Sequence, residues 1–132
     1  MENLNTDPRP NSWFLIAAVV MAATTLIHIF VGGPEVYVPL RQSAMDDLVV
    51  SVMSVVWHAI SVLLAIMAVG LAWLWRNQNP AMAWFIAAIQ IGFAVLFLCY
   101  GWIDLGTLWP MPQWIIFLVG PLLILCGLRR AR

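Results

Sequence analysis

The chain contains no lysine and few charged residues of any kind. Six arginines and six acidic side chains make up 9% of its 132 residues, and the formal net charge is zero. Hydrophobic residues account for 64% of the sequence, and the mean hydropathy is +0.95. A water-soluble domain of this size cannot bury so much apolar surface. The composition therefore predicts an integral membrane protein with no soluble domain.

The chain also lacks the residue patterns of several catalytic classes. It has only two cysteines, Cys99 and Cys126, which fall near opposite ends of two hydrophobic runs. We expect them to lie about a bilayer apart, beyond the reach of a disulfide, which argues against a thiol oxidoreductase. No HxxxH, HExxH or nucleophile-elbow motif occurs. No acidic residue falls within a hydrophobic run and no inverted repeat is visible, which argues against a coupled transporter.

What the chain does contain is four hydrophobic runs, each long enough to cross a hydrocarbon core, which takes about 20 helical residues. Proline, glycine, asparagine and charged residues separate these runs. The sequence therefore predicts an all-α membrane protein, a bundle of four transmembrane helices that forms a single domain over residues 1–132. The predicted spans are residues 13–31, 48–75, 81–101 and 113–128, and the predicted outer loops are residues 32–47 and 102–112.

Local signals place the ends of the first two helices. Two flexible glycines and a proline at residues 32–34 should end the first helix. Ser43 and Asp46 resemble a capping box, and acidic residues suit the first turn of a helix. We therefore expect the second helix to begin near Ala44, ahead of its membrane span.

Similar signals organise the second half of the chain. Asn79 is the expected N-cap of the third helix, with Pro80 at its first position. Gln90 falls near mid-membrane, where we expect it to form an interhelical hydrogen bond. Pro121 should kink the fourth helix.

The arginines orient the bundle through the positive-inside rule. One side is expected to carry five of them: Arg9, Arg76, Arg129, Arg130 and Arg132. The opposite side carries Arg41 with four acidic residues: Glu35, Asp46, Asp47 and Asp104. This asymmetry predicts a multi-pass protein of a bacterial-type inner membrane with both termini in the cytoplasm.

Both histidines of the chain fall within predicted spans. Measured from the cytoplasmic helix ends near Trp13 and Trp75, they lie about 22 to 26 Å up, in the outer half of the bundle. Ionisable residues inside spans are rare, usually face the bundle interior and are candidates for function. The sequence therefore predicts a polar pocket centred on His28 and His58. Its expected neighbours are Ser54, Ser61, Tyr100 and Gln113.

Several uses of this pocket remain open. The histidines can simply hydrogen-bond to neighbouring hydroxyls or carbonyls. They can also ligate a haem b from opposite faces, as in four-helix membrane cytochromes. With a tyrosine, they can instead be the hydrogen-bond partners in a quinone or lipid pocket at the outer leaflet. A non-haem metal is a further alternative, since imidazole and carboxylate suit zinc, copper or iron. The candidate metal ligands are His28, His58, Glu35 and Asp104.

We therefore predict a small non-enzymatic accessory or binding subunit of the inner membrane. The alternatives are a bis-histidine haem b electron-transfer protein and a quinone-binding or metal-binding subunit of a redox complex. The expected partners are the lipid bilayer and a larger membrane complex or further copies of the chain. We expect no nucleic-acid partner.

Overall fold

The computed structural model describes residues 9–130, so Arg132, expected in the basic C-terminal tail, lies outside the described residues. The described part consists of helices joined by short connections and contains no strand. Four of its helical segments are long and apolar enough to cross a membrane, which confirms the predicted number of spans. The elements are α1 (Ser12–Phe30), η1 (Gly33–Tyr37), α2 (Val38–Arg41), α3 (Asp47–Leu74), α4 (Pro80–Leu105) and α5 (Gln113–Arg130). These segments indicate a multi-pass membrane protein surrounded by lipid.

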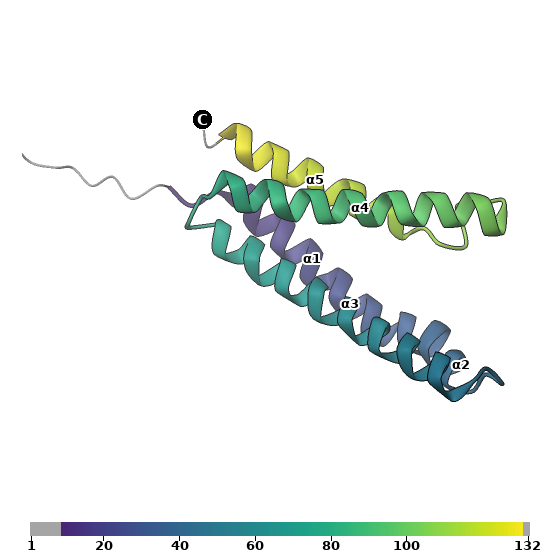
Figure 1. Cartoon of the computed structure of the whole chain (residues 1–132). Helices are drawn as coiled ribbons and strands as arrows, with labels where there is room; N and C mark the ends of the chain where they lie inside the picture. Colours follow the sequence, from purple (N-terminus) through teal and green to yellow (C-terminus); the bar gives the residue numbers. More distant parts are fainter. Residues whose placement is uncertain (1–8, 131–132) are drawn as a thin grey trace, which may run out of the picture.

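The helices form two pairs that diverge like the arms of a V (Figure 1). One arm consists of α1 packed against α3, and the other consists of α4 packed against α5. At the closed end, where the described termini and the turn at residues 75–79 lie, α1 also packs against α5. Here Gly70 allows α3 to approach Met82 and Ile86 of α4. The open end carries residues 31–46 on one arm and residues 106–112 on the other.

The buried apolar core lies mainly in the half of the molecule nearer the closed end. On α3 its fully buried side chains are confined to the last three turns of the helix. Phe14 of α1 reaches the backbone of α5 at Gly127, where a Cβ atom would lie 3.0 Å from the ring. Large side chains contributed by all four spans fill this region: Phe14, Met21, Leu64, Met67, Leu71, Leu74, Ile86 and Ile124.

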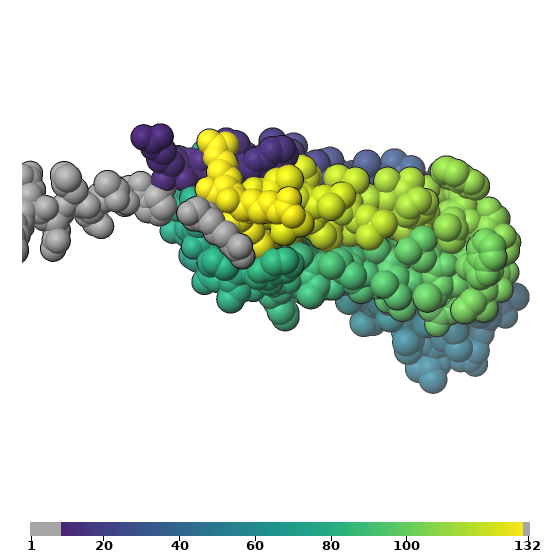
Figure 2. All heavy atoms as spheres, turned by 90° about the horizontal axis from the view of Figure 1, so that it is seen from above, coloured from purple at the N-terminus to yellow at the C-terminus, as the bar shows by residue number. Residues whose placement is uncertain are grey.

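Asn11 ties three helices together at the closed end. Its side chain is only 2% exposed. The side-chain Nδ2 donates to the carbonyl of Gly127 in α5 at 2.8 Å, and the backbone N–H donates to the carbonyl of Trp75 at 2.8 Å. The Oδ1 atom accepts from the N–H of Trp13 at 3.2 Å and so caps α1. Figure 2 shows the start of α1 beside the last turns of α5.

α1 ends at Phe30, within one residue of the predicted end of the first span, but the chain does not continue as an irregular loop. Helical turns continue through the π-helical segment η1 and through α2 to Arg41, so much of the predicted loop at residues 32–47 is helical. Pro34 stands at the start of η1, where the absence of its N–H is tolerated. Gly32 is needed for close packing rather than for a turn, because a Cβ atom there would lie 3.1 Å from the ring of Trp57.

Two other boundaries also differ from prediction. The N-cap of α3 is Asp46, whose carboxylate accepts from the N–H of Leu48 at 2.9 Å, whereas Ser43 donates to the carbonyl of Leu40. The second helix therefore begins at Asp47 and not near Ala44. The third helix begins as predicted, with Asn79 accepting from the N–H of Met82 at 3.0 Å ahead of Pro80.

At its other end, α4 extends past the predicted boundary at residue 101. It continues to Leu105 and ends at Gly106, whose φ of 65° lies in the left-handed region that glycine adopts readily. Gly101 lies inside the helix and allows Leu108 to approach, with its Cδ2 atom 3.2 Å from the position of a Cβ. The first part of the predicted loop at residues 102–112 is therefore helical.

Gln90 is fully buried between α4 and α5. Its predicted interhelical hydrogen bond is not formed, since neither amide atom has a partner among the described residues. Instead the amide lies against Gly120, where a Cβ atom would be 2.8 Å from the Gln90 Cδ. Pro121 follows inside α5. The absence of a side chain at residue 120 is thus what allows the two helices to enclose Gln90.

Replacing Gly120 by Ala should destabilise the protein by about 1 to 3 kcal/mol, the usual cost of overpacking a filled core. Gly92→Ala is the matched control, because a Cβ at that position meets nothing within 4 Å and alanine favours a helix. Thermal unfolding in detergent, followed by circular dichroism, should show a lower midpoint for Gly120→Ala alone. Equal midpoints for the two variants would contradict the close packing of Gln90 against Gly120.

Candidate functional site

Four ring-bearing side chains gather at the open end of the α1–α3 arm. They are His28 from α1, Tyr37 from η1, and Trp57 and His58 from α3; we call them the imidazole cluster. The continuation of helical structure past Phe30 brings Tyr37 back alongside α3. The cluster therefore depends on a segment for which the sequence predicts an irregular loop.

His28 is held firmly by its neighbour on α3. Its ring stacks on the indole of Trp57 with centroids 4.1 Å apart and planes 21° apart. Its Nε2 atom lies 3.4 Å from the carbonyl oxygen of Trp57, a long hydrogen-bond distance. Because a carbonyl only accepts, this contact requires the proton to be on Nε2. These two contacts give His28 a packing role between the helices.

Tyr37 links the two sides of the cluster. Its ring stacks on Trp57 at a centroid distance of 5.9 Å and meets His58 edge-on at 5.1 Å. Offset stacking and edge-on contacts of this kind are favourable arrangements for aromatic rings. The sequence alone does not place Tyr37 in the pocket, because the preceding glycines and proline predict the end of the helix.

His58 differs from His28 in being exposed. With 3.6 residues per turn, it lies about 140° around α3 from Leu63, which packs against the core. His58 therefore points away from the α4–α5 arm. Its imidazole forms no hydrogen bond with any other residue in the described range 9–130. Its ring nitrogens are consequently available on the lipid-facing side of the arm.

The hydroxyl groups of the two predicted serine neighbours bond to the backbone of their own helix. The hydroxyl of Ser54 donates to the carbonyl of Val50 at 2.8 Å, and that of Ser61 donates to the carbonyl of Trp57 at 3.1 Å. Serine residues inside helices commonly make such bonds to the preceding turn. Neither hydroxyl bonds to an imidazole.

The remaining predicted neighbours lie on the other arm. Tyr100 is 57% exposed on α4 and lines a cavity on that helix, and Gln113 is the exposed first residue of α5. The single polar pocket predicted from depth along the helices is therefore divided between two arms. His28 contacts Trp57 and His58 contacts Tyr37, and the rings of Tyr37 and Trp57 stack on each other, whereas Tyr100 and Gln113 do not join them.

The four candidate metal ligands are not assembled into one site. Glu35 and Asp104 are exposed on different arms. No group of three or more histidine, cysteine or acidic side chains with metal-binding geometry occurs within residues 9–130. A haem between the two imidazoles also fits poorly, because the Nε2 atom of His28 lies 3.4 Å from the carbonyl oxygen of Trp57 and is not free there to bind iron.

The two histidines should respond differently to substitution. His28→Ala removes an interhelical stack and a hydrogen bond and should cost about 1 to 2 kcal/mol. His58→Ala removes an exposed ring with one edge contact and should leave the unfolding midpoint nearly unchanged. Thermal unfolding of both variants in the same detergent checks this ranking, and a larger loss for His58→Ala would reverse the roles of the two histidines.

Comparison with known proteins adds no further assignment. No protein-family model matches the chain, and no curated protein or solved structure shows significant similarity to it. The function is therefore argued from the geometry of the site.

Proposed function

We propose that the chain is a non-enzymatic accessory or binding protein of a bacterial-type inner membrane, with its ligand site at the imidazole cluster. In this proposal both termini are cytoplasmic, so the closed end of the V faces the cytoplasm and the open end lies in the outer half of the bilayer. The distribution of arginines supports this orientation.

The observation that carries the proposal is the exposed imidazole of His58 within a membrane span. Polar side chains in a span usually face the bundle interior or bind a partner, since hydrocarbon offers no hydrogen bonds. His28 satisfies this rule through Trp57, whereas His58 has only the edge of the Tyr37 ring among the described residues. A ligand or a partner protein that supplies a hydrogen bond to His58 would remove this cost.

The surroundings of His58 indicate the class of ligand. A neutral imidazole offers one donor and one acceptor, and Tyr37 places an aromatic ring beside it. The site faces the bilayer, so the ligand must be lipophilic and must carry a carbonyl or hydroxyl group. A quinone head group meets these requirements, which makes the quinone-binding subunit of a redox complex the form of the proposal that the site favours.

This proposal is tested by analysing what copurifies with the protein in a mild detergent. We expect mass spectrometry of an organic extract to find a carbonyl-bearing lipophile in near-stoichiometric amount with the wild type. His58→Leu should lose it by about tenfold or more, the effect of about 1.4 kcal/mol. Val55→Leu is the matched control, since Val55 is exposed on the same helix.

Two results would contradict the proposal. Identical extracts from the wild type, His58→Leu and Val55→Leu would show that His58 binds no such molecule. A Soret band in the visible spectrum of the purified wild type, absent from both His28→Ala and His58→Ala, would establish the haem alternative instead.

A further inference from the structure

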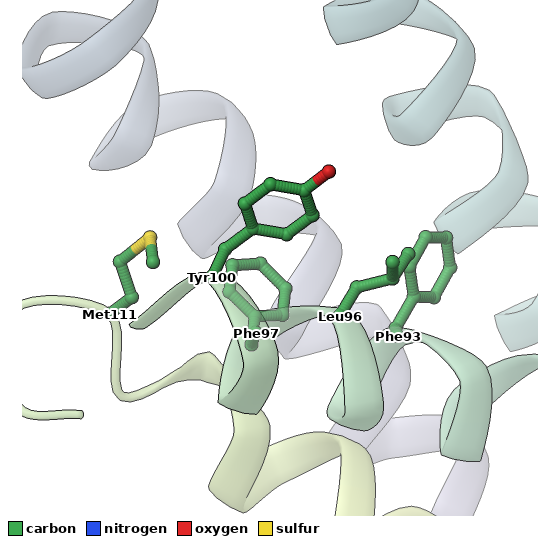
Figure 3. Close-up of a pocket in the computed structure, with 5 residues that line it drawn as sticks. All are labelled: Phe93, Leu96, Phe97, Tyr100 and Met111. Atoms are coloured by element: carbon green, nitrogen blue, oxygen red, sulfur yellow. The ribbon is translucent and has the colours of Figure 1, made fainter. Parts of the chain in front are cut away.

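We propose that the α4–α5 arm carries a second binding site, which holds one acyl chain of a membrane phospholipid. The site is a shallow cavity of about 290 Å³, open at the surface of α4. Its five lining residues are Phe93, Leu96, Phe97, Tyr100 and Met111 (Figure 3). The cavity shares no residue with the imidazole cluster, so this inference does not depend on the proposed function.

The chemistry of the walls requires an apolar occupant. Four of the lining residues follow one side of α4 over two turns, and Met111 stands on the following loop beside Tyr100 (Figure 3). Their side chains present carbon atoms and one thioether sulfur. The Tyr100 hydroxyl is their sole good hydrogen-bonding group. A ligand with several polar groups would leave those groups unpaired within the cavity.

The cavity is partly preformed. Phe93 and Phe97 both contact Phe117 of α5, with ring centroids 5.1 and 5.9 Å apart, and Phe117 is itself buried. The two phenylalanines are therefore supported from behind by the neighbouring helix. A site whose walls are already positioned loses less conformational entropy when it binds a flexible chain.

The shape of the cavity suits a hydrocarbon chain rather than another helix. Helices pack closely in membranes through small residues that let the backbones approach. On α4 the buried small residues Ala87 and Ala94 belong to the packed core, whereas the cavity is lined by large side chains. From Phe93 to Tyr100 the helix rises about 10 Å, which matches a segment of a single acyl chain.

The position of the cavity indicates how a phospholipid would lie. Tyr100 and Met111 mark its end nearer the open end of the V, beside the loop that carries Trp109. Trp102 and Trp109 are both strongly exposed, as expected for tryptophans at a membrane-water boundary. The head group would lie at that boundary, with the chain running past Tyr100 and Phe97 toward Phe93.

The test measures how much phospholipid remains bound after extensive washing in dodecyl maltoside. Palmitoyl-oleoyl phosphatidylglycerol is added before the wash and quantified afterwards by mass spectrometry. We expect about one phospholipid per chain for the wild type. Leu96→Trp fills the cavity from the helix and Met111→Trp fills it from the loop, and both should lower retention by fivefold or more.

Val95→Trp is the matched control, because Val95 is exposed on α4 and does not line the cavity. It should retain phospholipid like the wild type. Met111→Trp keeps the test decisive if Leu96→Trp fails to fold, since residue 111 lies outside the helices. Equal retention in Met111→Trp and Val95→Trp, no retention by the wild type, or recovery of an isoprenoid quinone in place of phospholipid would each overturn the proposal.

Discussion

The hydrogen bonds of Asn11 are the constraint on which the arrangement of the arms depends. One residue joins the start of α1 to the carbonyls of Trp75 and Gly127, so these ends of three spans cannot separate without leaving buried polar groups unpaired. The apolar core lies next to these hydrogen bonds, and Phe14 packs against Gly127. At the other end, where α3 and α4 diverge, no comparable hydrogen bond joins the arms within residues 9–130 (Figure 1). The V shape is thus the consequence of strong packing at one end only.

In the half of the molecule nearer the open end, the two arms present different kinds of surface. On the α1–α3 arm, Trp57 brings three elements together: it stacks on His28 and Tyr37, and its contact with Gly32 fixes the path of the chain into η1. His28 is occupied by these packing contacts, so His58 is the imidazole that remains available to a ligand. On the α4–α5 arm, the surface at the same distance from the closed end is apolar. There Phe93 and Phe97 pack against Phe117. One arm therefore offers hydrogen bonds and the other offers a place for a hydrocarbon chain.

The sequence predicts the number of spans well, because the length of an apolar run and the thickness of a bilayer are set by simple geometry. It also identifies Asn79 with Pro80 as a helix start, since the cap is local. It fails after residue 31, where it predicts a loop but the chain forms further helical turns, and contact with Trp57 rather than turn formation explains Gly32. It also places Tyr100 and Gln113 with the histidines, because counting residues gives the height of a side chain but not which arm it belongs to. The direction of His58 depends on which face of α3 packs against the core, and that is a tertiary property.

The divergence of the two arms from one joined end is tested most directly by electron-electron distance measurements between spin labels on α3 and α4. One label pair near the closed end uses Val69→Cys and Phe85→Cys, with Cys99 and Cys126 replaced by serine. The other pair uses Val52→Cys with the native Cys99, both exposed, and Cys126→Ser. We predict a clearly longer mean distance for the second pair in lipid nanodiscs. An equal or shorter distance would show a closed, parallel bundle and contradict the V-shaped arrangement.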